Sequence, residues 1–530
     1  MFHVLVLTLE NPMKPEDSSV ITDMDSKKLS NDLQKRKNTS FKGDVLRLVM
    51  GTGIAQIITV IASPILTRLY GPESFGLAAL FASFSGILGV MACMRYELTI
   101  LLPDNERESA NLLALSLTAS FIFALIITLV IWFGGPQLLA LARANKLVPY
   151  LWLIPVNILF GGIFTALNYW NTLTKHYLRL SIARVTSAGA ATSFTLGSGF
   201  AGYASGGALI AANTGGMVVA TAVLGGQILR DNGKFLIDNI SWGEMLVGLK
   251  RYRKFPIVSS WSALMNTASG QMPTILLSFF FSPIIVGFYA IGYRLCALPI
   301  SLLGSSIGQV FFQRAAVAKS DGSLPQVVLA TIDRLLLMSS FPFLLLMVIA
   351  PELFLILFGL KWSKAGVFVQ ILAPWLLFNS LYSPISSLID VLEIQEIDVI
   401  MNVALVLSRF ISLVIGGVMG NVFIALIMYS ISGVLIYIYF FMYVVVNKSG
   451  VNAHKLRILV TQRLLIGVVF VFPSIASKWI LGANKIMIIV IAVFSALAYY
   501  AYAISRDEQW QKYYFDFTSK ITAIVRGNGR

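Results

Sequence analysis

Apolar stretches recur along almost the whole chain and are separated by short polar breaks. Each stretch is about 20 residues long, which is enough for an α-helix to cross a hydrocarbon core roughly 30 Å thick. The pattern predicts an all-α polytopic membrane protein with about fourteen transmembrane helices. The predicted spans lie near residues 44–66, 75–95, 111–133, 148–170, 178–200, 203–229, 255–281, 284–312, 335–350, 365–390, 397–418, 421–446, 459–480 and 484–504.

Short motifs in the first six spans recur in the next six. Pro72-x3-Gly76-x2-Ala79 is repeated as Pro283-x3-Gly287-x2-Ala290, Pro136-Gln137-Leu138 as Pro351-Glu352-Leu353, and Leu153-Ile154-Pro155 as Leu372-Ala373-Pro374. The offsets grow slowly in chain order, which favours an internal duplication. Because six spans is an even number, the two copies share one orientation, as in transporters built from parallel repeats. We therefore expect two pseudo-symmetric six-helix lobes around a central cavity.

The spans and motifs divide the chain into successive parts. They are an N-terminal segment (1–43), an N-lobe (44–229), a basic linker (230–254), a C-lobe (255–446), two extra helices (447–504) and a tail (505–530). The extra helices fall outside the repeat and are interpreted as an appendage, serving the lipid tail or a partner. A stretch rich in Lys, Ser and Asn begins at Met24 and leads into the first span, so Met24 is a hypothetical start of translation, with Met1 as the alternative.

Charge sets the orientation of these spans. The chain is 57% hydrophobic and 12% charged, with a net charge of +15. Basic residues punctuate the apolar runs instead of gathering on one face, which argues against nucleic-acid binding. With the N-terminus inside, 31 of the 40 Lys and Arg fall on the inner side and 7 on the outer side. By the positive-inside rule both termini are cytoplasmic and the number of spans is even.

The sequence offers little for catalysis. Three histidines all lie outside the predicted spans, and Cys93 and Cys296 are too few for a disulfide framework or a CxxC metal site. Neither a nucleotide-binding glycine loop nor a GxSxG motif is present. The predicted outer loops are short, whereas membrane glycan polymerases and ligases need room to hold an acceptor. We expect no metal, no cofactor and no enzymatic activity.

Arginines inside the spans are the clearest candidate site residues. Arg294 and Arg409 lie near mid-depth of their spans, where an arginine costs about 2.5–3.5 kcal/mol on insertion scales and persists where something compensates it. A planar guanidinium suits a phosphate, so both are candidates for gripping an anionic headgroup. The alternative is that each pairs with a carboxylate, such as Asp390, or with helix carbonyls.

Other polar residues suggest a cavity mouth and a gate. Arg95, Arg184 and Arg334 lie near the predicted inner surface of the membrane. Each is interpreted either as a solvated or structural residue or as part of the cavity mouth. The leading helix of each lobe carries amides or hydroxyls followed by a proline, which bends a helix. Cavity or gate lining is one interpretation of these residues, and ordinary interhelical hydrogen bonding is the other. They are Gln56, Thr59 and Pro64 in the first lobe and Asn266, Gln271 and Pro273 in the second.

Three groups of residues resemble Wzx-type polysaccharide or O-antigen flippases, in the multidrug/oligosaccharidyl-lipid/polysaccharide exporter superfamily. The first two are Arg95-Tyr96-Glu97 with Leu102-Pro103, Glu108 and Asn111-Leu112, and Tyr293-Arg294-Leu295 with Leu298-Pro299 and Gly304. The third and most specific is Pro351-Glu352-Leu353-Phe354, Phe358-Gly359, Trp362, Ala365-Gly366 and Ile371-Leu372-Ala373-Pro374-Trp375. The resemblance covers residues from about 41 to 450.

The resemblance implies a flippase that moves undecaprenyl-pyrophosphate-linked oligosaccharide, such as an O-antigen, lipopolysaccharide, capsule or exopolysaccharide repeat unit. Transport would run by alternating access from the inner to the outer face of a bacterial inner membrane, with membrane lipid and possible polymerase or chain-length machinery as partners. Arg294 resembles a cavity arginine of lipid II flippases. Those relatives also carry arginines within their first spans, whereas Arg47 and Arg68 here lie near span ends, so a headgroup clamp in the first lobe is not implied.

Three other classes of function stay open at this stage. A drug or cation antiporter of the same superfamily should carry carboxylates in its cavity, and arginine at mid-depth argues against it. A glycan polymerase or ligase is disfavoured by the short outer loops. A scaffold in a synthesis complex would need no charge at mid-bilayer, and it is compatible with transport as an added role.

Overall fold

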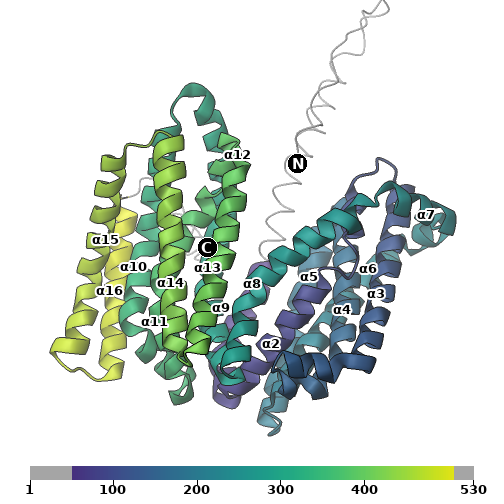
Figure 1. The fold of residues 1–530 in the computed structure, drawn as a ribbon, viewed down its shortest axis with the longest axis horizontal. Coiled ribbons are helices and arrows are strands. Elements are labelled where there is room, and N and C mark those ends of the chain that lie inside the picture. The colour runs from purple at the N-terminus through teal and green to yellow at the C-terminus, as the bar shows by residue number, and fades with distance from the viewer. Residues whose placement is uncertain (1–50, 507–530) are drawn as a thin grey trace, which may run out of the picture.

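The computed structural model describes residues 51–506, and within this range every regular element is helical. The predicted all-α class is therefore confirmed. The proposed start at Met24, the segment 1–43 and most of the tail 505–530 lie outside the described residues. Figure 1 shows two helical bundles side by side, which come together at the lower edge of the view and diverge toward the upper edge.

The first bundle, here called the N-lobe, precedes a short helix that leads to the second. It contains the helix Gly51–Leu69, α2 (Pro72–Gly89), α3 (Glu106–Leu141), α4 (Leu153–Leu173), α5 (Tyr177–Phe200) and α6 (Gly206–Asn239). The short helix α7 (Trp242–Arg251) and a π-helical turn (Phe255–Ser259) follow. The predicted linker at 230–254 is thus mostly helical.

The second bundle, here called the C-lobe, begins with α8 (Ser260–Phe280) and α9 (Pro283–Asp321). It continues with α10 (Leu324–Phe358), α11 (Ser363–Ile385), the short α12 (Leu388–Leu392), α13 (Gln395–Val418) and α14 (Val422–Phe440). The last two helices are α15 (Ala453–Ile475) and α16 (Lys485–Arg506). A long helix therefore stands at each of the fourteen predicted spans.

Ten helices in the described range are both long enough and apolar enough to cross a membrane. The four remaining predicted spans correspond to α2, α5, α8 and α9. The first part of α9, Pro283–Ala297, is apolar but shorter than a span within the residues searched. Both α2 and α5 line a cavity between the lobes, and a helix that faces an internal polar cavity needs fewer apolar residues than one surrounded by lipid.

Helix ends follow local chemistry that hydropathy does not read. Proline stands at the first turn of α2, α9 and α10, where its missing N–H has no helical partner to lose. Ser205 and Ser241 cap α6 and α7 through their hydroxyls. At the other end, α2 stops at Gly89, before the predicted residue 95, and the chain then turns through Met94 and Arg95 with positive φ angles of 51° and 62°. Helix α10 is far longer than its predicted span and continues through Pro342 and Pro351.

The two copies of the proline–glycine motif contact each other where the lobes meet. A Cβ built on Gly76 of α2 would overlap the carbonyl oxygen of Pro283, and one built on Gly287 of α9 would overlap that of Pro72. Such reciprocal contact is what a two-fold axis between the repeats produces. Only glycine allows α2 and α9 to approach this closely, as at other small-residue helix contacts in membranes.

Trp362 extends this contact from the C-lobe. Its side chain is fully buried, and its indole Nε1 donates to the carbonyl of Thr67 at 2.8 Å, in the last turn of the helix Gly51–Leu69. The rings of Phe75 from α2 and Phe288 from α9 pack edge-on against it, with centroids 5.3 Å and 6.1 Å away. Arg68 also donates to the carbonyl of Ile356 on α10, at 3.4 Å. The lobes are therefore tied at one end by hydrogen bonds as well as by packing.

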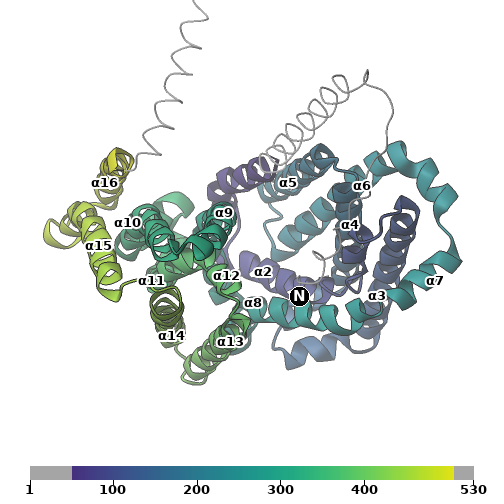
Figure 2. The same ribbon diagram turned by 90° about the horizontal axis from the view of Figure 1, so that it is seen from above.

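The appendage predicted at 447–504 packs on the outer side of α10, away from the N-lobe (Figure 2). Asp333 of α10 accepts two hydrogen bonds from Arg463 of α15, at 2.5 and 2.8 Å. Lys478 contacts Glu352 at 2.9 Å, and the hydroxyl of Tyr499 donates to the carbonyl of Leu337 at 2.7 Å. None of these residues lines the cavity between the lobes.

Loss of the Arg463–Asp333 pair should loosen the appendage. Arg463→Ala should lower the free energy of unfolding by about 1.5–3 kcal/mol, the range for hydrogen bonds between charged groups. A double-mutant cycle with Asp333→Ala, followed by thermal unfolding in detergent, measures the coupling. The matched control is Lys319–Glu393, a single contact of 2.9 Å between more exposed side chains, which should couple by at most about 1 kcal/mol. Equal coupling in both pairs would contradict the assignment.

Candidate functional site

A cavity of about 590 Å³ lies between the N-lobe and helix α9 of the C-lobe. Its walls come from the helix Gly51–Leu69 and from α2, α5, α6 and α9, with one residue from α4. The polar residues in the described part of the cavity lining are Thr52, Gln56, Thr59, Ser63, Arg184, Ser187, Thr192, Thr195, Asn213 and Arg294. Four sequence candidates, Gln56, Thr59, Arg184 and Arg294, are thus brought together here.

The helix Gly51–Leu69 presents a polar stripe to this cavity. Thr52, Gln56, Thr59 and Ser63 recur at helical spacing and all belong to the lining. Pro64 is not in the lining, but it shapes the same helix. Proline has no N–H to donate to the carbonyl four residues earlier, and the hydroxyl of Ser63 donates to that carbonyl of Val60 at 2.7 Å instead. Pro64 is therefore accommodated within a continuous helix.

Arg184 lies at the end of the cavity away from the contact between the lobes. Its guanidinium Nη1 donates to the hydroxyl of Thr52 at 2.6 Å. Thr52 is about 22 Å along its helix from Thr67, where Trp362 binds, at 1.5 Å per residue. Arg184 also begins a stripe on α5 that continues through Ser187, Thr192 and Thr195. This stripe was not predicted from the sequence, although its helical spacing from Arg184 is visible there.

Arg294 lies deeper, about 16 Å along α9 from its first residue, at 1.5 Å per residue. Its side chain is open to the cavity, and no hydrogen bond or ion pair engages it among the described residues. Ala290, Ile291 and Leu295 of the same helix complete this wall. Since no described residue engages Arg294, its N–H donors face the cavity, where a ligand can accept from them.

The cavity is positively charged. Arg184 comes from the N-lobe and Arg294 from the C-lobe, and the described lining includes neither Asp nor Glu. In a confined space of low dielectric, two cations without compensating carboxylates raise the local concentration of anions. The fork of N–H groups on each guanidinium matches the paired oxygens of a phosphate. The arrangement is suited to hold an anionic group between two lobes.

Arg409, the other candidate at mid-depth, lies elsewhere. Its guanidinium stands over the rings of Trp375 and Tyr429, with 5.4 and 5.5 Å to their centroids. The ring of Tyr293 stacks on Trp375, with centroids 6.1 Å apart. Arg409 is not in the cavity lining. Aromatic faces inside the C-lobe, instead of the carboxylate considered from the sequence, thus compensate its charge.

The predicted mouth and gate residues are spread over several sites. Arg95 forms a 3.4 Å ion pair with Glu97 beside a 3₁₀ helix (Tyr96–Leu101), where burial raises the pKa of the Glu97 carboxyl and Arg95 opposes this shift. Arg334 lies on α10, outside the cavity. On α8, Gln271 accepts from the hydroxyl of Ser83 at 2.8 Å, an interhelical hydrogen bond. Asn266 and Pro273 of α8 do not line the cavity either.

Only some of the glycines of α5 and α6 serve packing. A Cβ on Gly199 would press on Leu69 and Tyr70, and one on Gly216 would press on α5, whereas a Cβ on Gly189 or Gly197 would meet open space. The glycine-rich sequence therefore reflects close helix approach in part, as small residues do in membrane helices. The polar and small residues between these glycines form the cavity wall.

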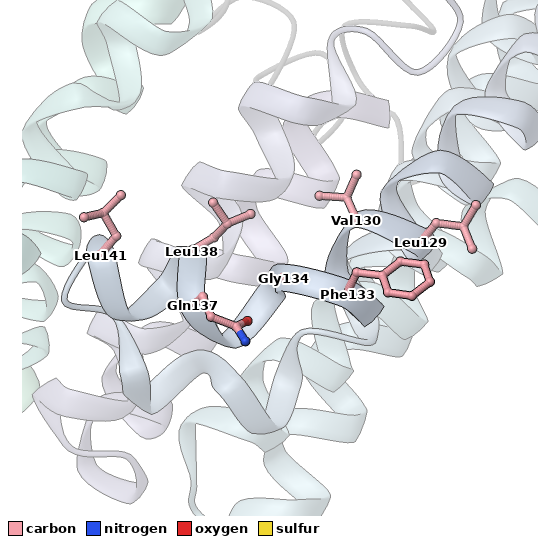
Figure 3. A pocket seen from close by; sticks show the side chains of 7 residues that line it. All are labelled: Leu129, Val130, Phe133, Gly134, Gln137, Leu138 and Leu141. Carbon is pink, nitrogen blue, oxygen red and sulfur yellow. The ribbon is translucent and has the colours of Figure 1, made fainter.

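A second hollow lies on α3, and its lining differs from that of the cavity between the lobes. Figure 3 shows its seven residues, Leu129, Val130, Phe133, Gly134, Gln137, Leu138 and Leu141, which all come from one helix. Its surface is almost wholly apolar, and Phe133 and Leu141 are exposed. An exposed apolar strip on a membrane-spanning helix is what a lipid-facing surface requires. It holds no charged group that could bind a headgroup.

The fold and the cavity define a polytopic membrane protein with two helical lobes around a basic site, as in transporters built from repeats. A family model described as polysaccharide biosynthesis protein matches residues 65–367, more than half of the chain. The chain belongs to this polysaccharide biosynthesis family. No curated protein sequence matches it.

Two solved structures share the fold. The lipid II flippase MurJ, in an inward closed conformation, has a TM-score of 0.63 at 13% identity, covering 86% of this chain and 98% of its own. An inward-facing multidrug resistance MATE family transporter of the MOP superfamily has a TM-score of 0.58 at 15% identity, covering 76% and 98%. The two-lobed helical fold expected from the sequence is thus confirmed. Since a flippase and a drug transporter are both similar, the fold alone does not select the substrate.

Proposed function

We propose that this chain is a flippase for a lipid-linked oligosaccharide carried on undecaprenyl pyrophosphate, in the inner membrane of a bacterium. The observation that carries the proposal is the basic cavity without described carboxylates, between the lobes of a polysaccharide biosynthesis family member. A pyrophosphate headgroup supplies the anion that Arg184 and Arg294 favour. The O-antigen, lipopolysaccharide, capsule or exopolysaccharide nature of the sugar is left open by this argument.

The proposed mechanism is alternating access. With both termini cytoplasmic, as the charge distribution predicts, the end of the cavity near Arg184 faces the cytoplasm and the Trp362 contact faces outward. The headgroup meets Arg184 first and Arg294 deeper, while sugars contact the hydroxyls and amides of the polar stripes. A cavity of about 590 Å³ holds a headgroup and a few sugars, so the polyprenyl tail stays in lipid. Parting of α2 and α9 would then open the outer side.

The membrane potential suits this direction of transport. Moving an anion out of a negative interior is favoured by about 2.3 kcal/mol per charge per 100 mV. The two negative charges of a pyrophosphate diester double this gain. The chain then acts as a transporter without ATP hydrolysis or a cofactor, and polymerase and chain-length proteins would use the delivered unit.

A drug or cation antiporter is the second candidate, because the MATE transporter shares the fold. Cations would be repelled by Arg184 and Arg294, and the described lining offers no carboxylate to attract them. A glycan polymerase or ligase is disfavoured because the helix connections within 51–506 are short, the longest between consecutive helices running from Val90 to Asn105. The charge of the cavity thus favours the flippase.

Reconstitution tests the proposal directly. Proteoliposomes are loaded with undecaprenyl-pyrophosphate-linked sugar that carries a fluorophore, and dithionite, which does not cross the bilayer, quenches the outer leaflet. The protein should make the inner-leaflet pool accessible, whereas protein-free vesicles should keep about half of the signal because only one leaflet is exposed. If vesicles that contain the protein kept about half of the signal and also took up ethidium actively, the antiporter would be favoured over the flippase.

A further inference from the structure

An apolar pocket of about 470 Å³ lies under the linker helix α7, apart from the cavity between the lobes. Six of its thirteen lining residues come from one face of α3, and four come from α7, which closes it. The residues that line it are Met94, Tyr96, Leu115, Thr118, Ala119, Ile122, Phe123, Ile126, Trp242, Met245, Leu246, Leu249 and Pro256. Apart from the hydroxyls of Thr118 and Tyr96, these side chains offer almost only hydrocarbon, aromatic and sulfur surface. The pocket suits a flexible hydrocarbon chain.

The pocket is separate from the proposed transport path. It shares no lining residue with the cavity that contains Arg294. In Figure 2, α7 and α3 lie at the far edge of the N-lobe, on the opposite side from the C-lobe. A lipid whose headgroup occupied the cavity would have to pass its tail through the helices of the N-lobe to reach this pocket. The occupant is therefore not the tail of the transported molecule.

Basic residues stand at the rim of the pocket. Leu249 and Pro256 both line it, and the exposed side chains of Lys250, Arg253 and Lys254 fall between them in the chain. No ion pair engages these three among the described residues. Arg251 differs, because Glu108 of α3 holds it at 2.8 Å. That ion pair fixes the end of α7 on α3 and leaves three cations facing outward.

Helix α7 has the character of a helix at the membrane surface. One face carries Trp242, Met245, Leu246 and Leu249 at helical spacing toward the pocket. Apolar side chains nearby are also open on the outside, including Trp242 at 66% and Val258 at 62% exposure. An amphipathic helix with Trp and Leu on one side and Lys and Arg at its end lies in the interface between headgroups and acyl chains. Its cations then stand at the level of lipid phosphates.

We propose that the α7 pocket binds an anionic phospholipid of the surrounding bilayer. One acyl chain enters between α3 and α7, and the phosphate lies beside Lys250, Arg253 and Lys254. Charge complementarity selects this occupant over a neutral lipid, since clusters of Lys and Arg on amphipathic helices attract anionic lipids. The site is independent of the molecule that the central cavity transports.

The bound lipid would act on the connection between the lobes. Pro256 lies in the π-helical turn Phe255–Ser259, which joins α7 to α8. Such turns frequently occur at functional sites in helices. Helix α8 in turn contacts α2 of the N-lobe and α13 of the C-lobe. A lipid held under α7 therefore fixes the start of the segment that links the two moving bodies, and transport should depend on anionic lipid.

Lipid retention tests this site. The full chain is reconstituted in nanodiscs of equimolar phosphatidylglycerol and phosphatidylcholine, and native mass spectrometry measures the lipids kept on the protein. The wild type should retain phosphatidylglycerol preferentially. Lys250→Gln/Arg253→Gln/Lys254→Gln should reduce this preference by about tenfold or more, given the attraction of each basic residue to anionic lipid. Ala119→Trp, which fills the pocket, should reduce retention of both lipids.

Two matched variants separate the site from general lipid contact. Gly134→Trp adds the same bulk to the lipid-facing hollow of Figure 3, and Lys455→Gln/Arg457→Gln removes charge at the start of α15. Neither should change retention. A thermal unfolding curve for each variant confirms that it is folded. Equal retention of the two lipids by the wild type, no effect of the triple variant or of Ala119→Trp, or displacement of phosphatidylglycerol by undecaprenyl phosphate would each overturn the proposal.

Discussion

Arg294→Ala should abolish delivery of surface polysaccharide in a strain that depends on this gene, while the amount of protein in the membrane is unchanged. The guanidinium faces the cavity without a described protein partner, so its removal costs the fold little. A headgroup that loses a charged partner in a confined site binds more weakly by about 2–5 kcal/mol, or at least tenfold. Arg294→Lys should recover part of the activity, because an ammonium keeps the charge but not the planar fork.

The thermal midpoint distinguishes this role from a structural one. Because the Arg294 side chain is exposed to the cavity and no described residue pairs with it, Arg294→Ala should leave the midpoint of unfolding unchanged while transport falls. Arg314→Ala, an exposed arginine near the other end of α9, is the matched control and should preserve polysaccharide. Full polysaccharide from Arg294→Ala, or a midpoint that falls along with activity, would remove Arg294 from the proposed headgroup site.

Arg294 and Arg409 also show which properties of a site residue can be predicted from the sequence. Both lie at mid-depth of predicted spans, and hydropathy treats them alike. The structure separates them through tertiary neighbours: Trp375 and Tyr429 come from α11 and α14 to surround Arg409, whereas Arg294 faces open volume. No spacing in α9 or α13 predicts those neighbours. The depth of both residues in the membrane stays a prediction from the sequence, and the means of charge compensation could not be predicted.

The fold could be predicted more fully from the sequence than the site, because the length of an apolar run is a local property that the bilayer fixes. Helix ends were harder to predict, because α2 ends at Gly89, ahead of the left-handed residues Met94 and Arg95, and α10 continues through Pro342 and Pro351 to Phe358. The cavity was found in part. Gln56 and Thr59 are polar residues in an apolar run and attract attention, whereas Ser187 and Thr192 stand among small residues that also predict packing.

The charge of the cavity and the contact between the lobes are complementary parts of one mechanism. The cavity can release its ligand on the other side only if the contact around Trp362 and Gly76 opens. The hydrogen bond from Trp362 to the carbonyl of Thr67 and the glycine contacts hold that side closed. Transport therefore requires a closed contact that is stable but not permanent, and its strength should be adjustable by a single methyl group.

Gly76→Ala should weaken the closed contact between α2 and α9 and reduce transport. The added Cβ overlaps a backbone carbonyl, that of Pro283, which cannot rotate away as a side chain can, so the helices must separate. Overpacking of this kind costs about 1–3 kcal/mol, which would lower the population of the closed contact by about 5–150-fold. Gly287→Ala should act in the same way, because it meets the carbonyl of Pro72 reciprocally.

Spin labels on Asn145→Cys and Lys361→Cys, with Cys93 and Cys296 replaced, report the separation of the lobes at this end. Pulsed electron resonance should give a longer and broader distance distribution in Gly76→Ala than in the parent. Gly86→Ala on the same helix has open space around its Cβ, and because alanine favours a helix by about 1 kcal/mol over glycine, it should leave both distance and transport intact. If Gly76→Ala matched Gly86→Ala in both measurements, α2 and α9 would not form the contact that has to open.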